Sequence, residues 1–438
     1  MKRVLIITYY WPPSGGSGVQ RWLKMSKYLP ENGWQPVVYT PENPESPVED
    51  LTLESDVCAE AEVVKTHIFE PYSFYKKFVG VKKDEKVKMG LVNEGEHKSS
   101  WKERLTLWIR GNLFIPDARR WWVKPSVRFL KKYLKEHPVD AIITTGPPHS
   151  MHLIGMKLHD ALDIPWMADF RDPWTEIDYY QDLHLTRHAD RKHHRLEGQV
   201  LSKADRVIAI GWDMAESFKR LGAQRVEVVT NGYDWDTDTS IQHADLSEKF
   251  TLSHIGLLGP TRNIPTFWRA ISELAERHPD FRQHLDIQLI GQVDISALRL
   301  IETLGLKDVV THLPHIPHDE VMQKQCASRA LLLFINNTPN AKGILTGKLF
   351  EYLSSGRPVL CIGPEDGDAA HIISEAKAGA TVGFDDKDKM EAAIMQLFDD
   401  YRNGEPHQSD MNVIKRYSRQ EQSRIIADTL NEMTKDAQ

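Results

Sequence analysis

Two hydrophobic patterns alternate along the first half of the chain. Short, continuous apolar runs are typical of strands that are buried on both faces of a parallel sheet. Apolar residues at helical spacing, as in residues 19–29, lie between these runs. The predicted strands are residues 4–10, 36–39, 141–144, 166–170 and 206–210. Alternating strands and helices predict a doubly wound α/β sheet.

A second series of the same kind begins after a turn-rich stretch at residues 234–247, which lacks apolar periodicity. We expect this stretch to connect two domains. The predicted strands of the second series are residues 251–256, 287–291, 309–313, 331–335, 358–362 and 380–382, with helices at 265–277, 319–328 and 348–354. The last helix of the chain carries one apolar stripe, and we expect it to pack back on the first domain.

The length of the chain supports two domains. Its 438 residues exceed what one hydrophobic core holds and fit two domains of about 200 residues each. The sequence therefore predicts an α/β protein with two Rossmann-like, doubly wound domains that face an interdomain cleft. The N-terminal domain is residues 1–235, completed by a C-terminal helix at 415–438, and the C-terminal domain is residues 248–414.

The composition excludes several classes of protein. With 41% hydrophobic and 27% charged residues, it is that of an ordinary globular protein. No window reaches the roughly 18 uncharged apolar residues that a membrane span needs, and the N-terminus lacks a signal-peptide pattern. We therefore expect a cytoplasmic protein. The three cysteines include no C-x-x-C pair, which argues against a disulfide framework or a structural zinc site.

Basic residues are concentrated in one segment. Residues 76–135 hold 17 Lys and Arg residues against 6 Asp and Glu residues, within a chain of net charge −7. Trp101, Trp108, Trp121 and Trp122 lie in the same segment. A basic, tryptophan-rich amphipathic segment is suited to an anionic membrane surface, here the inner face of the plasma membrane, where it reaches a lipid-linked acceptor. The alternative is a solvated charged helix whose tryptophans pack on the first domain.

A glycine-rich loop at residues 11–18 follows the first predicted strand and contains Gly15 and Gly16. Glycines there let backbone N–H groups approach an anion such as a diphosphate, with a helix N-terminus adding partial positive charge. With Gly16 and Gly18, the dinucleotide fingerprint requires a third glycine at the position of Arg21, which argues against a nicotinamide or flavin enzyme. A tight turn explains such a loop equally well.

A second candidate phosphate site is the stretch G-I-L-T-G-K-L-F-E-Y-L-S-S-G-R-P-V-L at residues 343–360. Gly347 and Lys348 begin a predicted helix after a buried strand, so that backbone N–H groups and an ammonium group converge there. Glu351, one turn later, can accept hydrogen bonds from both ribose hydroxyls of a nucleotide. The glycine spacing and Leu349 exclude a Walker A loop. The alternative is an exposed helix with an incidental Lys and Glu.

Residues 348–360 resemble the donor-site signature of the retaining glycosyltransferases of family GT4, which have the GT-B fold. The glycine loop, the N-G-Y-D turn at 231–234, the strand and basic loop at 256–264, and segments 145–150 and 169–174 resemble the same family in order, the last two in members that make bacterial surface polysaccharides. The resemblance implies transfer of a hexose-type sugar from a nucleoside diphosphate sugar to a saccharide or lipid-linked saccharide acceptor. It implies neither a metal ion, nor a further cofactor, nor a nucleic-acid partner.

The resemblance assigns roles to several residues. It implies that Glu351 holds the ribose, that Gly347 to Leu349 help bind the diphosphate, and that Gly15 and Gly16 form the family's N-terminal glycine loop. Arg262 takes the place of the family's diphosphate lysine. The H-x-x-H-x-x-H run at residues 312–318 is not interpreted as a metal site, because prolines keep it extended and no carboxylate or cysteine pattern completes it.

Two positions depart from the family pattern. The arginine usually found five residues before Arg262 is Leu257, and the first glutamate of the family's E-x7-E pair corresponds to Gly343. One charge on the leaving group and one contact to the donor sugar are thus missing, and Lys348 can supply the charge. These departures keep open the alternative of a non-catalytic sugar-nucleotide-binding partner protein. A sugar-nucleotide epimerase of the same fold is a further alternative, but it needs acid/base carboxylates, and the sequence shows no convincing set of them.

Two residues of the first domain are candidates for chemistry. His149 follows a buried strand, at the edge where open α/β sheets bind ligands, and the resemblance places a histidine of this domain against the donor sugar. A purely structural hydrogen bond is the alternative. Asp172 is suited either to orienting the acceptor hydroxyl or to a local Asp–Arg pair. His188, His193 and His194 are predicted to be surface residues.

Overall fold

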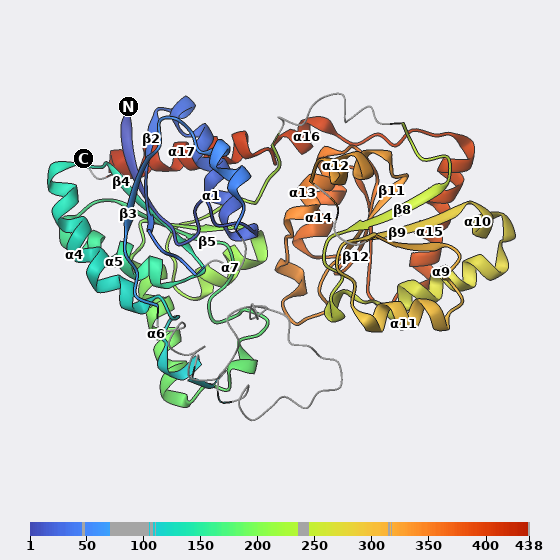
Figure 1. Ribbon diagram of the computed structural model, residues 1–438, viewed down its shortest axis with the longest axis horizontal. Helices are drawn as coiled ribbons and strands as arrows, with labels where there is room; N and C mark the ends of the chain where they lie inside the picture. The colour runs from blue at the N-terminus through green and yellow to red at the C-terminus, as the bar shows by residue number, and fades with distance from the viewer. Residues whose placement is uncertain are drawn as a thin grey trace. The chain divides into compact units, whose positions relative to one another are not determined.

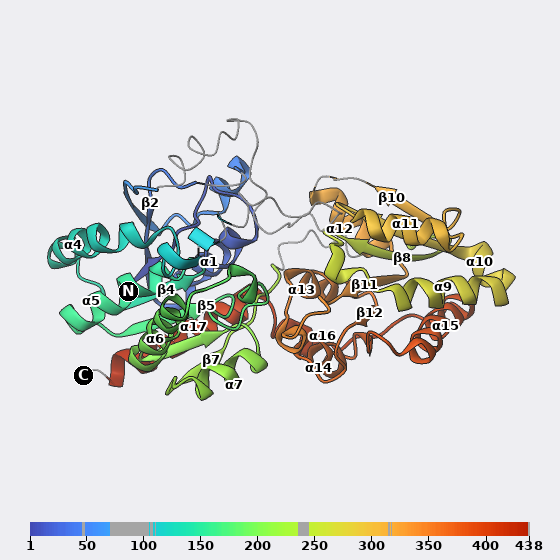
Figure 2. The same ribbon diagram turned by 90° about the horizontal axis from the view of Figure 1, so that it is seen from below.

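The computed structural model describes residues 1–45, 49–70, 105, 108–109, 111–234, 245–313, 316 and 318–436. The chain divides into two compact units, each with its own sheet. Unit 1 is Met1–Thr230 with Arg419–Gln438, and unit 2 is Asn231–Ser418. Both units alternate strands and helices, which confirms the predicted pair of Rossmann-like α/β halves (Figures 1 and 2). Most of the predicted connection, at residues 235–244, lies outside the described residues.

The sheet of unit 1 has the strand order β3-β2-β1-β4-β5-β6-β7, and all pairs are parallel. Its strands are β1 (Lys2–Ile7), β2 (Trp34–Pro41), β3 (Glu62–Thr66), β4 (Ala141–Gly146), β5 (Trp166–Phe170), β6 (Arg206–Ala209) and β7 (Val226–Val228). The first strand ends at Ile7, three residues before its predicted end at Tyr10. Strands β3 and β7 were not predicted, because these edge strands are partly exposed and carry no continuous buried apolar run.

Helices cover both faces of this sheet, because successive strand residues point to opposite sides. Val4 and Ile6 pack in a core with α1 and α17, whereas Leu5 and Ile7 pack in a core with α4, α5, α6 and α7. The helices are α1 (Ser17–Tyr28), α4 (Arg120–Glu136), α5 (Ser150–Leu162), α6 (Arg187–Lys203), α7 (Trp212–Arg220) and α17 (Arg419–Asp436), with the 3-10 helices η1 (Pro30–Asn32), η2 (Leu51–Asp56) and η3 (Gln181–Leu183). The apolar stripe of the last helix thus packs on the sheet of unit 1.

The sheet of unit 2 has the order β10-β9-β8-β11-β12-β13 and is also parallel. Its strands are β8 (Phe250–Ile255), β9 (Leu285–Ile290), β10 (Val310–Leu313), β11 (Ala330–Phe334), β12 (Val359–Ile362) and β13 (Gly379–Val382). Its helices are α9 (Pro265–Arg277), α10 (Pro279–His284), α11 (Ile295–Thr303), α12 (His318–Ala327), α13 (Gly347–Ser354), α14 (Asp368–Glu375), α15 (Lys387–Asn403) and α16 (Met411–Lys415), with η4 (Pro260–Arg262) and η5 (Ala341–Gly343). Helices α9, α10, α11 and α15 share one apolar core with the sheet, while α12, α13 and α14 contact strands β8, β11 and β12.

The direction of strand addition reverses at one place in each sheet. In unit 1 the reversal lies between β1 and β4, and in unit 2 it lies between β8 and β11. Open α/β sheets bind ligands outside the carboxyl ends of the strands at such a switch point. The loops that follow these four strands are therefore where a ligand site is expected.

Candidate functional site

The loops after β8 and β11 are joined at the switch point of unit 2. Arg262, in η4 after β8, donates from Nε to the Oδ1 atom of Asn336, just after β11, at 2.6 Å. Arg262 also donates from Nη1 to the carbonyl oxygen of Leu257 at 3.2 Å. The side chain predicted to bind a diphosphate is therefore held at the carboxyl edge of the sheet.

Lys348 reaches the same place from helix α13. It is the second residue of this helix, which begins at Gly347 as the sequence predicts. Its Nζ atom donates to the carbonyl oxygen of Leu257 at 3.5 Å, and Arg262 uses the same acceptor. Two basic side chains thus converge on one carbonyl group, although residue 257 has no charge of its own.

The backbone after β8 is shaped to admit the Lys348 side chain. Gly256 has a φ of +109°, and a Cβ atom there would lie 2.6 Å from the Cε atom of Lys348. Gly291 has a φ of +115°, and a Cβ atom there would lie 2.8 Å from the carbonyl oxygen of Gly256. Both positions therefore require glycine. The lysine side chain lies against the main chain at the end of β8.

His254, in β8, is a member of this site that the sequence did not reveal, because it stands inside an apolar strand pattern. It is buried, and its Nδ1 atom lies 2.9 Å from the carbonyl oxygen of Leu332. A carbonyl oxygen only accepts, so Nδ1 donates and Nε2 remains an acceptor. The Nε2 atom lies 3.4 Å from Nζ of Lys348. The imidazole thus lies beneath the lysine as a hydrogen-bond acceptor.

Burial changes the acid–base properties of both groups. It lowers the pKa of Lys348 to about 7, with a further lowering by Arg262 and a smaller opposite effect of Glu351. It also lowers the pKa of His254 to about 3, and the Lys348 charge adds to this lowering. His254 is therefore neutral at pH 7, whereas Lys348 changes between its amine and ammonium forms near that pH.

The other donor-site candidates lie on the first turns of α13. Gly347 and Glu351 are both exposed. The side chain of Leu349 is buried, and its backbone N–H donates to the carbonyl oxygen of Thr346 at 3.2 Å. Since the first N–H groups of a helix lack intrahelical partners, an anion has access to the start of α13. Leu349 contributes packing there, and its N–H group is already engaged.

At the switch point of unit 1, the glycine loop leads from β1 into α1. Gly15 is buried, while Gly16 is exposed, has a φ of +90° and occupies the N-cap of α1 without a side-chain cap. Gly18 is required by packing, because a Cβ atom there would lie 2.9 Å from the Tyr10 ring and 3.1 Å from Nη1 of Arg171. The loop therefore presents an uncapped helix N-terminus, which suits an anion.

His149 follows β4 at the same switch point and occupies the N-cap of α5. Its ring stacks on Trp174, with centroids 4.7 Å apart and planes 3° apart. Its Nδ1 atom is buried without a hydrogen-bond partner, so a ligand can reach the ring only through Nε2. Burial holds the pKa of His149 well below its usual range, and the nearby His152 and Arg171 lower it further. His149 is therefore a neutral hydrogen-bonding group at physiological pH.

Asp172 follows β5 and is exposed. Its neighbour Arg171 donates from Nη1 to the carbonyl oxygen of Gly18 at 2.7 Å and from Nη2 to the carbonyl oxygen of Pro147. Arg171 thus ties together the loops that follow β1, β4 and β5. The glycine loop, His149 and Asp172 stand on these three loops, so the fold gathers the unit 1 candidates at one edge of the sheet.

The structure contradicts the prediction that His193 lies on the surface, and for Trp122 it supports the alternative that the tryptophan packs on the first domain. His193 of α6 is buried, and its Nδ1 atom accepts a hydrogen bond from Nε1 of Trp174 at 3.0 Å. Trp122 of α4 is also buried and stacks on Tyr39 with centroids 4.9 Å apart. Both residues stand among charged neighbours in the sequence, but each lies on the helix face that packs inward.

The described part of the basic segment exposes both basic and large apolar side chains. The Arg120 guanidinium lies 5.5 Å from the centroid of the Trp121 ring. Residues 71–104, which include Trp101, lie outside the described residues. Among the helices that the structure describes, none is long and apolar enough to cross a membrane. Large apolar side chains are exposed at Leu105, Trp108, Leu113 and Trp121.

The histidine run begins in β10. His312 approaches the carbonyl oxygen of Gly291 with its Nε2 atom at 2.9 Å. The side chains of His315 and His318 lie outside the described residues. Among the side chains that are described, no group of three or more His, Cys, Asp or Glu residues is placed to hold a metal ion.

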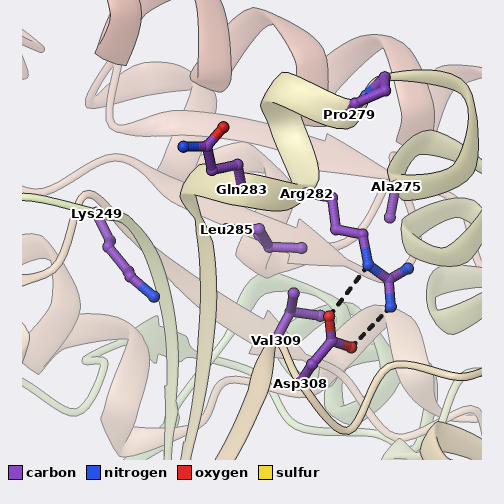
Figure 3. Close-up of a pocket in the computed structure, with 8 residues that line it drawn as sticks. All are labelled: Lys249, Ala275, Pro279, Arg282, Gln283, Leu285, Asp308 and Val309. Atoms are coloured by element: carbon purple, nitrogen blue, oxygen red, sulfur yellow. Dashed lines mark hydrogen bonds and ion pairs between the residues drawn. The ribbon is translucent and has the colours of Figure 1, made fainter.

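A surface pocket of unit 2 lies away from these residues (Figure 3). It is lined by residues of α9 and α10 and by residues at or just before the starts of β8, β9 and β10, and an ion pair between Arg282 and Asp308, 2.7 Å long, borders it. Ligands of open α/β sheets bind at the carboxyl ends of the strands. Because this pocket lies at the amino ends, it is not the candidate nucleotide site.

Comparison with known proteins gives a domain match over part of the chain and a fold. Residues 96–233 match the family model of a glycosyl transferase 4-like domain. No curated protein sequence matches the chain. Similar solved structures include a sucrose-phosphate synthase from Thermosynechococcus elongatus (14% identity, TM-score 0.63, 100% of both chains) and Anabaena HepE in complex with UDP-glucose (13%, 0.58, 99% of this chain and 100% of that one). A third is a Listeria monocytogenes protein described as a UDP-N-acetylglucosamine 2-epimerase (10%, 0.55, 99% and 97%). At these identities the likeness establishes the GT-B fold alone.

Proposed function

The chain carries a glycosyl transferase 4-like domain and has the GT-B fold, and from this premise we propose that it is a retaining glycosyltransferase. It moves a hexose-type sugar from a nucleoside diphosphate sugar to a saccharide or lipid-linked saccharide, in the synthesis of a cell-surface polysaccharide. The observation that carries this proposal is the convergence of Arg262 and Lys348 on the Leu257 carbonyl at the switch point of unit 2.

The two basic side chains serve the leaving group. When the bond between sugar and diphosphate breaks, negative charge grows on the diphosphate, and fixed positive charge beside it stabilises the transition state. Arg262 and Lys348, with the exposed start of α13 at Gly347, supply that charge. Lys348 supplies the positive charge of the family's arginine, whose position Leu257 occupies.

The remaining roles follow the family resemblance. Glu351, exposed one turn into α13, accepts the ribose hydroxyls. His149 offers Nε2 as a neutral hydrogen-bonding group to the donor sugar. Asp172, exposed after β5, orients the acceptor hydroxyl. In front-face displacement the leaving diphosphate itself takes the acceptor proton, so this proposal includes no separate protein base.

Donor binding and turnover test the proposal with the purified full chain. Thermal unfolding is measured with UDP-, GDP- and dTDP-sugars, and the stabilising donor is then incubated with a panel of saccharide and lipid-linked acceptors. We expect stabilisation by one class of donor, followed by sugar transfer with retained anomeric configuration. Failure of every donor to bind contradicts the proposal. Binding without transfer or hydrolysis across the whole panel favours a non-catalytic binding protein.

An epimerase is the second candidate, because one similar structure is described as a UDP-N-acetylglucosamine 2-epimerase. Epimerisation requires acid/base groups that remove and return a proton at a sugar carbon. Incubation of the donor in ²H₂O without an acceptor separates the two reactions. Deuterium in a sugar C–H bond, in either the donor or a released sugar, indicates an epimerase, whereas release of the nucleoside diphosphate without deuterium in a sugar C–H bond supports a transferase.

We also propose that the enzyme works in the cytoplasm at an anionic membrane surface, where lipid-linked acceptors are located. The exposed Trp108, Trp121 and Leu113 provide apolar contact, and Arg120 beside Trp121 provides positive charge. Apolar side chains with adjacent basic groups are the combination that anionic bilayers bind. The buried Trp122 is not part of this surface.

A further inference from the structure

Lys348 is held by two acceptors at the proposed diphosphate position. Its Nζ atom donates to Nε2 of His254 at 3.4 Å and to the carbonyl oxygen of Leu257 at 3.5 Å. A neutral amine has two N–H groups and satisfies both acceptors, whereas an ammonium group has three. The third N–H group, which appears only on protonation, is left for a ligand.

His254 fixes the position of Nζ and does not itself exchange a proton near neutral pH. Its Nδ1 donates to the carbonyl oxygen of Leu332, and the ring is buried. Protonation at Nε2 would turn the acceptor for Lys348 into a donor facing it. His254 is therefore a positioning residue.

The charged and titratable groups around Lys348 come from three elements. Arg262 of η4 disfavours the ammonium form, and Glu351 of α13 favours it. His254 of β8 is neutral, because burial lowers its pKa to about 3. Tyr352 of α13 stays a neutral phenol, because burial raises its pKa above the usual range. Burial and Arg262 lower the pKa of Lys348 more than Glu351 raises it. An anion beside Lys348 therefore favours the ammonium form.

We propose that Lys348 takes up one proton from solvent when a nucleoside diphosphate binds at the start of α13, with His254 holding its amine in place. The inference rests on the proposed function. A diphosphate brings at least two negative charges, which favour the ammonium form. The proton goes to the lone pair of Nζ, and the new N–H group donates to a diphosphate oxygen. The site then gains the full charge that stabilises the leaving group only when a nucleotide occupies it.

Proton uptake is measured by isothermal titration calorimetry of the full chain with UDP, GDP and dTDP, in HEPES and in Tris at equal pH. The difference in heat between the two buffers gives the number of protons bound. Because burial lowers the pKa of Lys348 to about 7, we expect the uptake per nucleotide to be larger at pH 8 than at pH 7 and to approach one proton at the higher pH. Affinity should fall by up to about tenfold per pH unit above pH 7, because binding then requires a proton that is increasingly scarce.

Substitutions at Lys348 and His254 test whether Lys348 is the group that takes up the proton. Lys348→Arg keeps the charge at every pH, so it should bind the nucleotide with no proton uptake and a flat pH profile between pH 7 and 9. His254→Phe removes one acceptor and should weaken binding at pH 7 by about threefold to tenfold. His284→Phe, on α10, is the matched control and should bind with the wild-type affinity and uptake. If His254→Phe does not fold, the wild-type pH series and Lys348→Arg still decide the question.

The outcomes separate this inference from the proposed function. Nucleotide binding by the wild-type chain without proton uptake at pH 8, or unchanged uptake in Lys348→Arg, overturns the inference and leaves the proposed function standing. A chain that binds none of the nucleoside diphosphates contradicts the proposed function itself.

Discussion

Arg21 and Asp169 form a buried ion pair inside unit 1, with Nη2 of Arg21 2.7 Å from Oδ1 of Asp169. The carboxylate also accepts hydrogen bonds from Nε1 of Trp22 at 2.7 Å and from Oγ1 of Thr145 at 2.8 Å. Arg21 donates further to two backbone carbonyl groups just after β7. The pair thus connects α1, β4, β5 and the end of β7. The arginine that breaks the dinucleotide pattern anchors the helix that follows the glycine loop.

The Asp169→Ala variant should be strongly destabilised. The change leaves the Arg21 charge buried without its partner, which costs about 3–5 kcal/mol in free energy of unfolding. Asp160→Ala is the control, since it breaks the exposed pair with Lys203 in the same unit and should cost about 1 kcal/mol or less. Urea denaturation followed by circular dichroism measures both values. Similar losses in the two variants contradict the structural role of the buried pair.

Lys348→Ala should weaken the binding of a nucleoside diphosphate by about 10- to 100-fold at pH 7, because one charge-assisted hydrogen bond to the diphosphate is lost. Lys342→Ala is the matched control. Lys342 is exposed in η5 and pairs with Asp366. Calorimetric titration gives both dissociation constants. Equal effects of the two substitutions would place the diphosphate elsewhere.

Glu351→Ala should discriminate between ligands with and without a ribose. Loss of the ribose acceptor should weaken the binding of a nucleoside diphosphate by about tenfold and leave the affinity for inorganic pyrophosphate unchanged. Glu365→Ala, which removes an exposed carboxylate that pairs with Lys389, should change neither affinity. Competition binding gives the dissociation constants of the nucleoside diphosphate and of pyrophosphate for the wild-type chain and each variant. A parallel loss of pyrophosphate binding would show that Glu351 acts on the site's charge.

His149→Ala should lower kcat for sugar transfer by about 100-fold while leaving the affinity for the free nucleoside diphosphate unchanged, since the ring is proposed to contact only the sugar. The ratio of wild-type to variant rates should be constant from pH 6 to pH 9, because burial holds the pKa of His149 well below that interval. His188→Ala, exposed on α6, is the control. A ratio that changes with pH across this interval contradicts a neutral His149.

Replacement of both Trp108 and Trp121 by Ala should reduce co-sedimentation with anionic phosphatidylglycerol vesicles by about fivefold, because two apolar contacts with the bilayer are removed. Met411→Ala in unit 2 is the control for an exposed apolar residue. Trp122→Ala does not serve this test, since emptying a buried tryptophan site should cost about 3–5 kcal/mol of stability. Unchanged vesicle binding in the double variant contradicts the membrane proposal.

Local sequence patterns determined the secondary structure and the start of the donor-site helix. Apolar runs identified the six strands of unit 2, and Gly347 marked the first residue of α13. These features depend on backbone periodicity and on residues close in the chain, which is why they can be predicted. The edge strands β3 and β7 were missed because partial exposure removes that periodicity.

Only the tertiary structure decided which polar groups meet. Lys348 contacts His254 and the Leu257 carbonyl from about ninety residues away, because α13 begins beside the end of β8. The position of a backbone carbonyl group cannot be read from a sequence, because every residue has one. A histidine inside an apolar strand pattern gives no sign of a functional role. The inward faces of α4 and α6, which bury Trp122 and His193, are likewise fixed by how those helices pack. Burial and proximity, which set charge and pKa, are properties of the assembled fold.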